Sequence, residues 1–207
     1  MACTGEREET GTASGTLRGR GARRADGRDS RAGDPGTGEG ALAWSVAAMS
    51  GALRRLAGAR AADIPQAVAA ATEAVWWVTA VDAAMIRQHP AEYGRALAAL
   101  DPAARRAVER SFAGLRFIRG QLGYSADPGD FIERHASGRG PALAWTWRHL
   151  PPPPPQRGTA RDTSPYREYR AQLAGRPLTE ALTGTADFLS QVHAAARAGH
   201  RSPASTI

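Results

Sequence analysis

The feature that most constrains the fold of this chain is a helical spacing of apolar residues that continues from residue 41 almost to the end. Apolar side chains recur three or four positions apart, which places them on one face of an α-helix. Asp-Pro signals such as Asp101-Pro102 punctuate the pattern, because Asp caps a helix and proline fits its first turn. The strongest stripe comprises Ile64, Val68, Ala71, Val75, Val78, Asp82 and Met85. The spacing predicts an all-α fold, a single helical bundle domain over residues 41–198.

The first forty residues follow different rules. Their only large apolar residues are Met1 and Leu17, and seven arginines balance seven acidic residues. Such a segment buries too little apolar surface to offset the entropy of ordering it, so residues 1–40 are predicted to be a disordered tail. The segment lacks the apolar stretch that a secretory signal peptide contains, so we do not interpret it as one. An arginine-rich patch at 18–24 allows RNA contact, but the interleaved acids favour a solvated tail, and either Met1 or Met49 remains possible as the native start.

A Trp- and Pro-rich segment, residues 143–163, interrupts the helical pattern near the middle of the domain. Trp145 and Trp147 alternate as in an extended strand and are expected to pin this segment onto the helices. Five consecutive prolines from Pro151 form a polyproline II spacer, so we interpret the segment as a rigid extended connector. Residues 199–207 are predicted to be a flexible C-terminus.

Composition excludes several chemistries. All 27 basic residues are arginine, which removes P-loops and lysine Schiff bases. Cys3 is the sole cysteine, so no disulfide framework or cysteine-ligated zinc is expected. Asp127, Asp130, Glu133 and His135 have a spacing that resembles a metal site, but Asp127 before Pro128 is better explained as a helix cap. We therefore expect no metal and no cofactor.

Net charge and hydropathy bear on partners and location. The formal charge is +7, which favours nucleic acid or anionic surfaces, although the codon bias of a GC-rich genome has the same effect. Glu73 and Asp82 interrupt the most apolar stretch, and each would cost about 3 kcal/mol at the centre of a bilayer. We expect a cytoplasmic protein with no membrane partner.

Asp82 is the most informative single residue. It falls at the centre of an apolar stripe, where a carboxylate is costly unless it is paired. Arg119, at the edge of the apolar stripe of the 102–122 helix, is the expected partner. Trp76 and Trp77 are expected to widen the buried face. Two interpretations remain open: a buried ion pair that fixes helix register, or an acid–arginine pair in a cleft that receives a ligand phosphate or carboxylate.

Three sequence segments resemble known families: residues 76–82 (WWVTAVD), 116–124 (RFIRGQLGY) and 144–147 (AWTW). Over roughly residues 65–195 the chain resembles an uncharacterised family of small actinobacterial proteins, which implies no established activity. The middle segment, which also contains Arg116, is similar to the HEPN helical ribonucleases. By that resemblance Arg119 would match the family's arginine and Asp82 its acidic residue. The histidine that follows the arginine in HEPN proteins is missing, so the general acid/base of that family is absent here.

These observations leave three classes of function. The first is a non-enzymatic helical binding protein, with a protein or RNA partner and a possible homodimer through the long helices. The second is a HEPN-like RNA-binding protein or ribonuclease relative that is inactive. The third is a small-molecule pocket lined by Trp76, Trp77, Asp82 and Arg119. Arg116 is included among the candidate binding residues.

Overall fold

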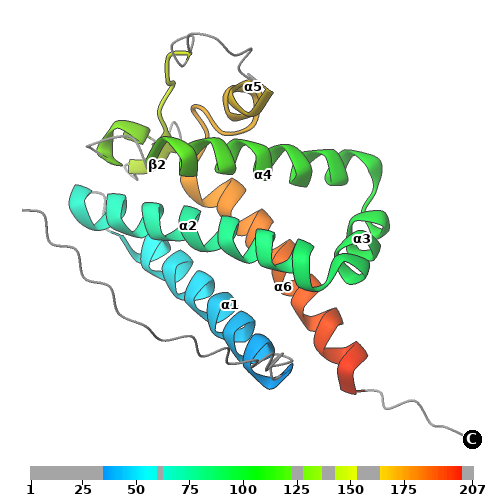
Figure 1. Ribbon diagram of the computed structural model, residues 1–207. Helices are drawn as coiled ribbons and strands as arrows, with labels where there is room; N and C mark the ends of the chain where they lie inside the picture. The colour runs from blue at the N-terminus through cyan, green and yellow to red at the C-terminus, as the bar shows by residue number, and fades with distance from the viewer. Residues whose placement is uncertain (1–34, 60–62, 123–127, 137–142, 153–163, 202–207) are drawn as a thin grey trace, which may run out of the picture. The chain divides into compact units, whose positions relative to one another are not determined.

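The computed structural model describes residues 35–59, 63–122, 128–136, 143–152 and 164–201, which all belong to one compact unit, Asp34–Ile207 (Figure 1). Over these residues the fold is helical, with a single two-stranded sheet, which confirms the predicted all-α class. The helices are α1 (Pro35–Gly58), α2 (Ile64–Gln88), α3 (Pro90–Ala99), α4 (Pro102–Leu122), α5 (Ser164–Gln172) and α6 (Leu178–Arg201).

Helices α2 and α4 each begin at an aspartate cap. Asp63 accepts a hydrogen bond from the backbone N–H of Gln66 at 3.0 Å, and so caps α2. Asp101 does the same for α4 by accepting from Ala103 and Ala104 at 2.8 and 2.9 Å. These caps satisfy backbone donors that have no partner within the helix.

Two boundaries differ from those expected. Helix α1 begins at Pro35, six residues before the expected start at 41, and α6 continues to Arg201, past the expected stop near Gly199. Proline at the first helical position explains the earlier start of α1. The expected disorder of residues 1–40 is therefore wrong for 35–40, and the expected flexibility of residues 199–207 is wrong for 199–201, because both stretches are helical. The rest of the two segments, 1–34 and 202–207, lies outside the described residues.

Helix α2 is the centre of the domain, because it packs against α1, α4 and α6. Figure 1 shows α2 lying between α1 and α4, with α6 crossing them. Its buried face consists mostly of alanines and valines, which permit close helix approach, together with Thr79, Asp82 and Met85. Its neighbours contribute large enclosed side chains to this core, namely Met49, Phe112, Leu115, Ile118, Leu182 and Leu189.

The connector is partly a hairpin, which the helical pattern did not indicate. After a 3₁₀ turn at Pro128–Phe131, strand β1 (Ile132–Ala136) pairs antiparallel with β2 (Leu143–Trp147). The extended character of β2 was predicted, whereas β1 was not, because Ile132 directly follows the turn and reads equally well as its last residue. Trp147 is buried and Trp145 is half-buried, as expected for side chains that pin this segment onto the helices. The prolines from 153 onward lie outside the described residues.

The hairpin is joined to the helices through the turn between α5 and α6. Trp147 donates its backbone N–H to the carbonyl of Arg176 at 3.0 Å, and Gly175 donates to the carbonyl of Trp147 at 2.7 Å. Gly175 has φ +75°, a left-handed conformation that glycine adopts without the strain that a Cβ would add. The Tyr169 hydroxyl on α5 also donates to the carbonyl of Arg148.

Candidate functional site

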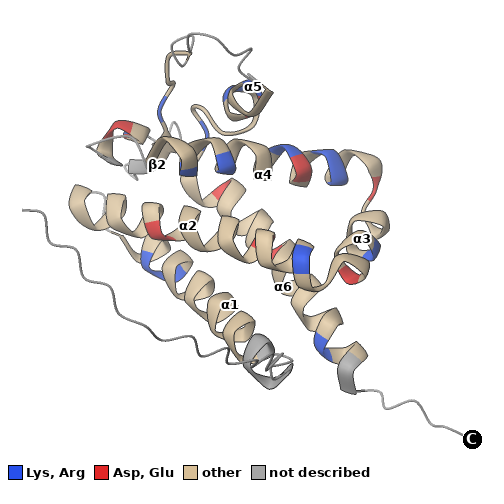
Figure 2. Cartoon of the chain, viewed as in Figure 1, with Lys and Arg blue, Asp and Glu red and all other residues tan. Residues whose placement is uncertain are grey.

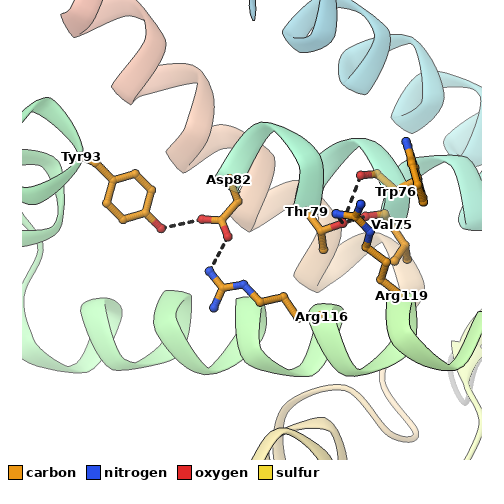
Figure 3. A network of polar contacts seen from close by, with 7 residues as sticks. All are labelled: Val75, Trp76, Thr79, Asp82, Tyr93, Arg116 and Arg119. Atoms are coloured by element: carbon orange, nitrogen blue, oxygen red, sulfur yellow. Dashed lines mark hydrogen bonds and ion pairs between the residues drawn. The ribbon is translucent and has the colours of Figure 1, made fainter. Parts of the chain in front are cut away.

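A polar network lies between α2, α3 and α4 and centres on Asp82 (Figure 3). The Asp82 side chain has no exposed surface. One carboxylate oxygen accepts a hydrogen bond from the Tyr93 hydroxyl at 2.7 Å, and the other forms an ion pair with the guanidinium of Arg116. Because a buried carboxylate needs charged and hydrogen-bonding partners, both oxygens are used in holding the three helices together.

Tyr93 is a functional residue of this network that sequence reasoning missed. Pro90 starts α3 immediately after α2, so the chain turns back and brings Tyr93 over Asp82. Its ring packs edge-on against Phe188 of α6, with centroids 5.2 Å apart. Burial, with the nearby Asp82 carboxylate adding to it, raises the pKa of Tyr93, so the hydroxyl stays protonated and donates. The sequence feature that could have indicated Tyr93 is its position as an aromatic residue with a hydroxyl on the apolar side of a short helix.

The Asp82–Arg116 pair is unequal in its exposure. The carboxylate is fully enclosed, while half of the Arg116 side chain remains exposed to solvent. The guanidinium also lies 5.8 Å from the ring centroid of Phe112, one turn earlier on α4. Arg116 therefore brings a charge to the buried carboxylate without being buried itself.

The predicted pairing of Asp82 with Arg119 is wrong. Arg119 donates to the Thr79 hydroxyl at 3.2 Å, and its guanidinium lies over the indole of Trp76, 4.3 Å from the ring centroid. Helices α2 and α4 run antiparallel, so the contact three residues before Asp82 on α2 is made three residues after Arg116 on α4 (Figure 3). An apolar stripe reports how a helix is rotated, but not how far it is shifted along its neighbour.

The two tryptophans of α2 occupy different environments. Trp77 is half-buried, and its ring meets Trp44 of α1 edge-on with centroids 5.1 Å apart. Trp76 is 53% exposed, so the expectation that both indoles widen the buried face is wrong for Trp76. Thr79 is satisfied within α2, because its hydroxyl also donates to the carbonyl of Val75 at 2.8 Å.

A shallow apolar groove runs along α2 beside the exposed Trp76. It is lined by Pro65, Val68, Ala69, Thr72, Glu73 and Trp76. Figure 2 shows that α2 carries few charges, whereas arginines recur along α4. Glu73, at the edge of the groove, is paired with Arg55 of α1 at 2.5 Å. The groove is therefore apolar, with its bordering carboxylate already neutralised.

A second cavity, of about 260 Å³, lies between the start of α1 and the end of α6, beside the joint of α2 and α3. His89, His193 and Arg197 line it together with small apolar side chains. Burial lowers the pKa of His193, and the positive groups of Arg197 and His89 lower it further. These surroundings therefore favour the neutral form of the His193 imidazole.

The structure bears on two further expectations about sites. Within the parts of the chain that are described, no three His, Cys, Asp or Glu side chains converge as metal ligands would. In the acidic cluster of residues 127–135, Asp130 is exposed, and its Oδ1 lies 3.9 Å from a guanidinium nitrogen of Arg148. Asp127 and the side chain of His135 are not among the described residues. None of the helices, over their described residues, has the length and apolarity needed to cross a membrane.

Comparisons with known proteins do not identify a relative. No protein-family model matches the chain, and no curated protein or solved structure matches it either. The class that the fold defines is a helical bundle with a polar network between its helices and an exposed Trp–Arg stack on its surface.

Proposed function

We propose that this chain is a non-enzymatic helical interaction protein that binds a protein partner through the solvent-facing side of α2. This side, here called the α2 outer face, consists of Pro65, Ala69, Thr72, Trp76, Ala83 and Arg87. These residues follow one another at helical spacing along the whole length of the helix. Five of the six are uncharged, so this side offers a largely uncharged surface to a partner.

The observation that carries this proposal is the exposed indole of Trp76. Tryptophan is enriched among the residues that dominate binding energy at protein interfaces, where it fills pockets of the partner. The Arg119 guanidinium 4.3 Å from the ring centroid restrains the indole, so less side-chain entropy is lost on binding. An exposed, restrained tryptophan beside an apolar groove is typical of a protein-binding surface.

A protein fits this surface better than RNA does. RNA binding depends on cations that are free to neutralise phosphates. Beside the α2 outer face, Arg55 is paired with Glu73 and Arg116 with Asp82, while Arg119 stacks on Trp76. Three of the arginines beside this face therefore already have partners, which leaves Arg87, on the last turn of α2, as the arginine of the face with no ion pair to a described residue.

The network at Asp82 supports a structural role rather than catalysis. An acid that acts on a substrate must reach it, and the Asp82 carboxylate is enclosed, with Tyr93 and Arg116 on its two oxygens. A HEPN-like activity would need Asp82 and Arg119 at one reacting centre, whereas Arg119 contacts Thr79 and Trp76. The same arrangement disfavours a ligand pocket between Asp82 and Arg119.

Site-specific photo-crosslinking tests the proposal. A photoreactive amino acid replaces Thr72, one turn from Trp76, and the control replaces Ala107 on the exposed side of α4. In cells of the source organism, position 72 should give a discrete protein adduct that is lost when Ala69→Glu is added and retained with Ala107→Glu. Adducts that nuclease removes would transfer the role to RNA, and equal labelling at both positions would refute a binding face on α2.

A further inference from the structure

We propose that the partner of the α2 outer face is a second copy of this chain, packed antiparallel about a twofold axis that passes near Trp76. This inference rests on the proposed function and specifies its partner. It follows from the position of Trp76, the sizes of the side chains around it and the charges at the two ends of α2.

Trp76 is the central residue of α2, which runs from Ile64 to Gln88. A twofold axis at this point places each position opposite the one equally distant on the other side of Trp76. Ala69 of one copy then faces Ala83 of the other, and Thr72 faces Ala80, which lies one turn after Trp76 on the same side of α2. These are small side chains, so the two helices can approach closely on either side of the paired indoles.

Charge complementarity selects the antiparallel arrangement. Asp63 caps the start of α2, and Arg87 lies on the last turn. In this register Arg87 of each copy lies opposite Pro65 of the other, two residues from Asp63, so an acidic and a basic side chain come near each other at both ends of the interface. A parallel arrangement would instead place each charge beside its own kind, which is unfavourable. Asp63 and Arg87 are both exposed, and the structure shows no ion pair between either of them and another described residue.

The size of the surface predicts a weak dimer. A helix of 25 residues is about 37 Å long, and a contact strip about 10 Å wide covers about 400 Å² on each copy. A standard interface buries about 800 Å² on each partner. Exposed Trp44 on the adjacent α1 adds to the apolar surface next to α2. Self-association should therefore depend on concentration rather than be permanent.

Cysteine crosslinking tests the register directly, in a Cys3→Ser background with Trp76 intact. A mixture of Ala69→Cys and Ala83→Cys chains, treated with a short bis-maleimide, should give a species of twice 21.8 kDa. Either variant alone should not, because its two cysteines would lie fourteen residues apart along the helix, about 21 Å. Crosslinking of Ala69→Cys alone would overturn the antiparallel register, and no crosslinking of the mixture would overturn the dimer.

A charge cycle provides a second readout that does not depend on cysteine. Arg87→Glu should weaken self-association about tenfold, since Asp63 would then lie near a glutamate. Adding Asp63→Asn, which keeps the helix cap, should restore most of the loss. An unchanged dimerisation constant in Arg87→Glu would contradict the proposed pairing. If the pure chain stays monomeric while position 72 crosslinks a different protein in cells, the dimer fails but the protein-binding role stands, and if neither occurs both fail.

Discussion

The unequal exposure of Asp82 and Arg116 makes a specific prediction about stability. Removing Arg116 leaves a carboxylate with no exposed surface and only the Tyr93 hydroxyl as a partner. Removing Asp82 leaves a guanidinium of which half already contacts water. Arg116→Ala should therefore destabilise the protein more than Asp82→Ala does, even though the two changes break the same ion pair.

The magnitudes follow from what each change leaves behind. An uncompensated buried charge costs about 3–5 kcal/mol, which we expect for Arg116→Ala at neutral pH. Asp82→Ala leaves the Tyr93 hydroxyl without its acceptor and should cost about 1–3 kcal/mol. Once Asp82 is alanine no charge needs a partner, so removing Arg116 as well should add less than about 1 kcal/mol.

Urea unfolding at constant temperature measures these differences for the two single variants and the double variant. Arg119→Ala is the matched control, because it removes an arginine of the same helix that does not contact Asp82. It should cost about 1 kcal/mol, the value of its stacking on Trp76. The reasoning fails if Arg116→Ala costs no more than Asp82→Ala, or if the two changes are additive.

Two further predictions concern the packing of α4 and the titration of His193. At Gly114 an added Cβ would lie 2.2 Å from Leu173 Cδ1 and 3.2 Å from Tyr169 Cα, so Gly114→Ala should cost about 1–3 kcal/mol. At Gly120 an added Cβ would have nothing within 4 Å, so Gly120→Ala should stabilise the protein by about 0.5–1 kcal/mol. If thermal melts show both variants stabilised or both destabilised, the packing of α4 on α5 is contradicted. The pKa of His193 in the folded chain lies below 6.5, so as the pH falls the unfolded chain takes up a proton on His193 before the folded chain does. The free energy of unfolding should therefore fall as the pH drops below 6.5, and should go on falling until the pH has passed the folded-state pKa of His193. In His193→Gln the midpoint of urea unfolding should depend less on pH over this range. A variant with the same pH dependence as the native chain would refute this prediction.

The sequence predicted the helices well, because the relevant signals are local. Asp101 caps α4 where the Asp-Pro signal predicts it, and the stripe of α2 faces the core around Val75 and Val78. Strand β1 was missed because a five-residue strand has little period of its own, and Ile132 reads equally well as the end of a turn. Its pairing with β2 is a non-local contact that no local pattern contains.

The candidate site was only partly predictable. Asp82 stood out because a carboxylate in an apolar stripe must have a partner, and it has two. The choice of Arg119 over Arg116 failed because it depends on the axial offset between α2 and α4. Large aromatic side chains are usually buried, which favours a core position for Trp76, but α1 and α4 flank α2 without covering this side chain.

The central claim is that the outer face of α2 is a protein-binding surface whose partner is a second copy. Sedimentation velocity over a dilution series tests it most directly, using the native chain, Ala69→Glu on this face and Ala107→Glu on α4 as the matched control. The account predicts that the native chain and Ala107→Glu shift from dimer to monomer on dilution, while Ala69→Glu remains monomeric with an unchanged melting temperature. A native chain that is monomeric at every concentration, or a dimer that Ala69→Glu leaves intact, would contradict it.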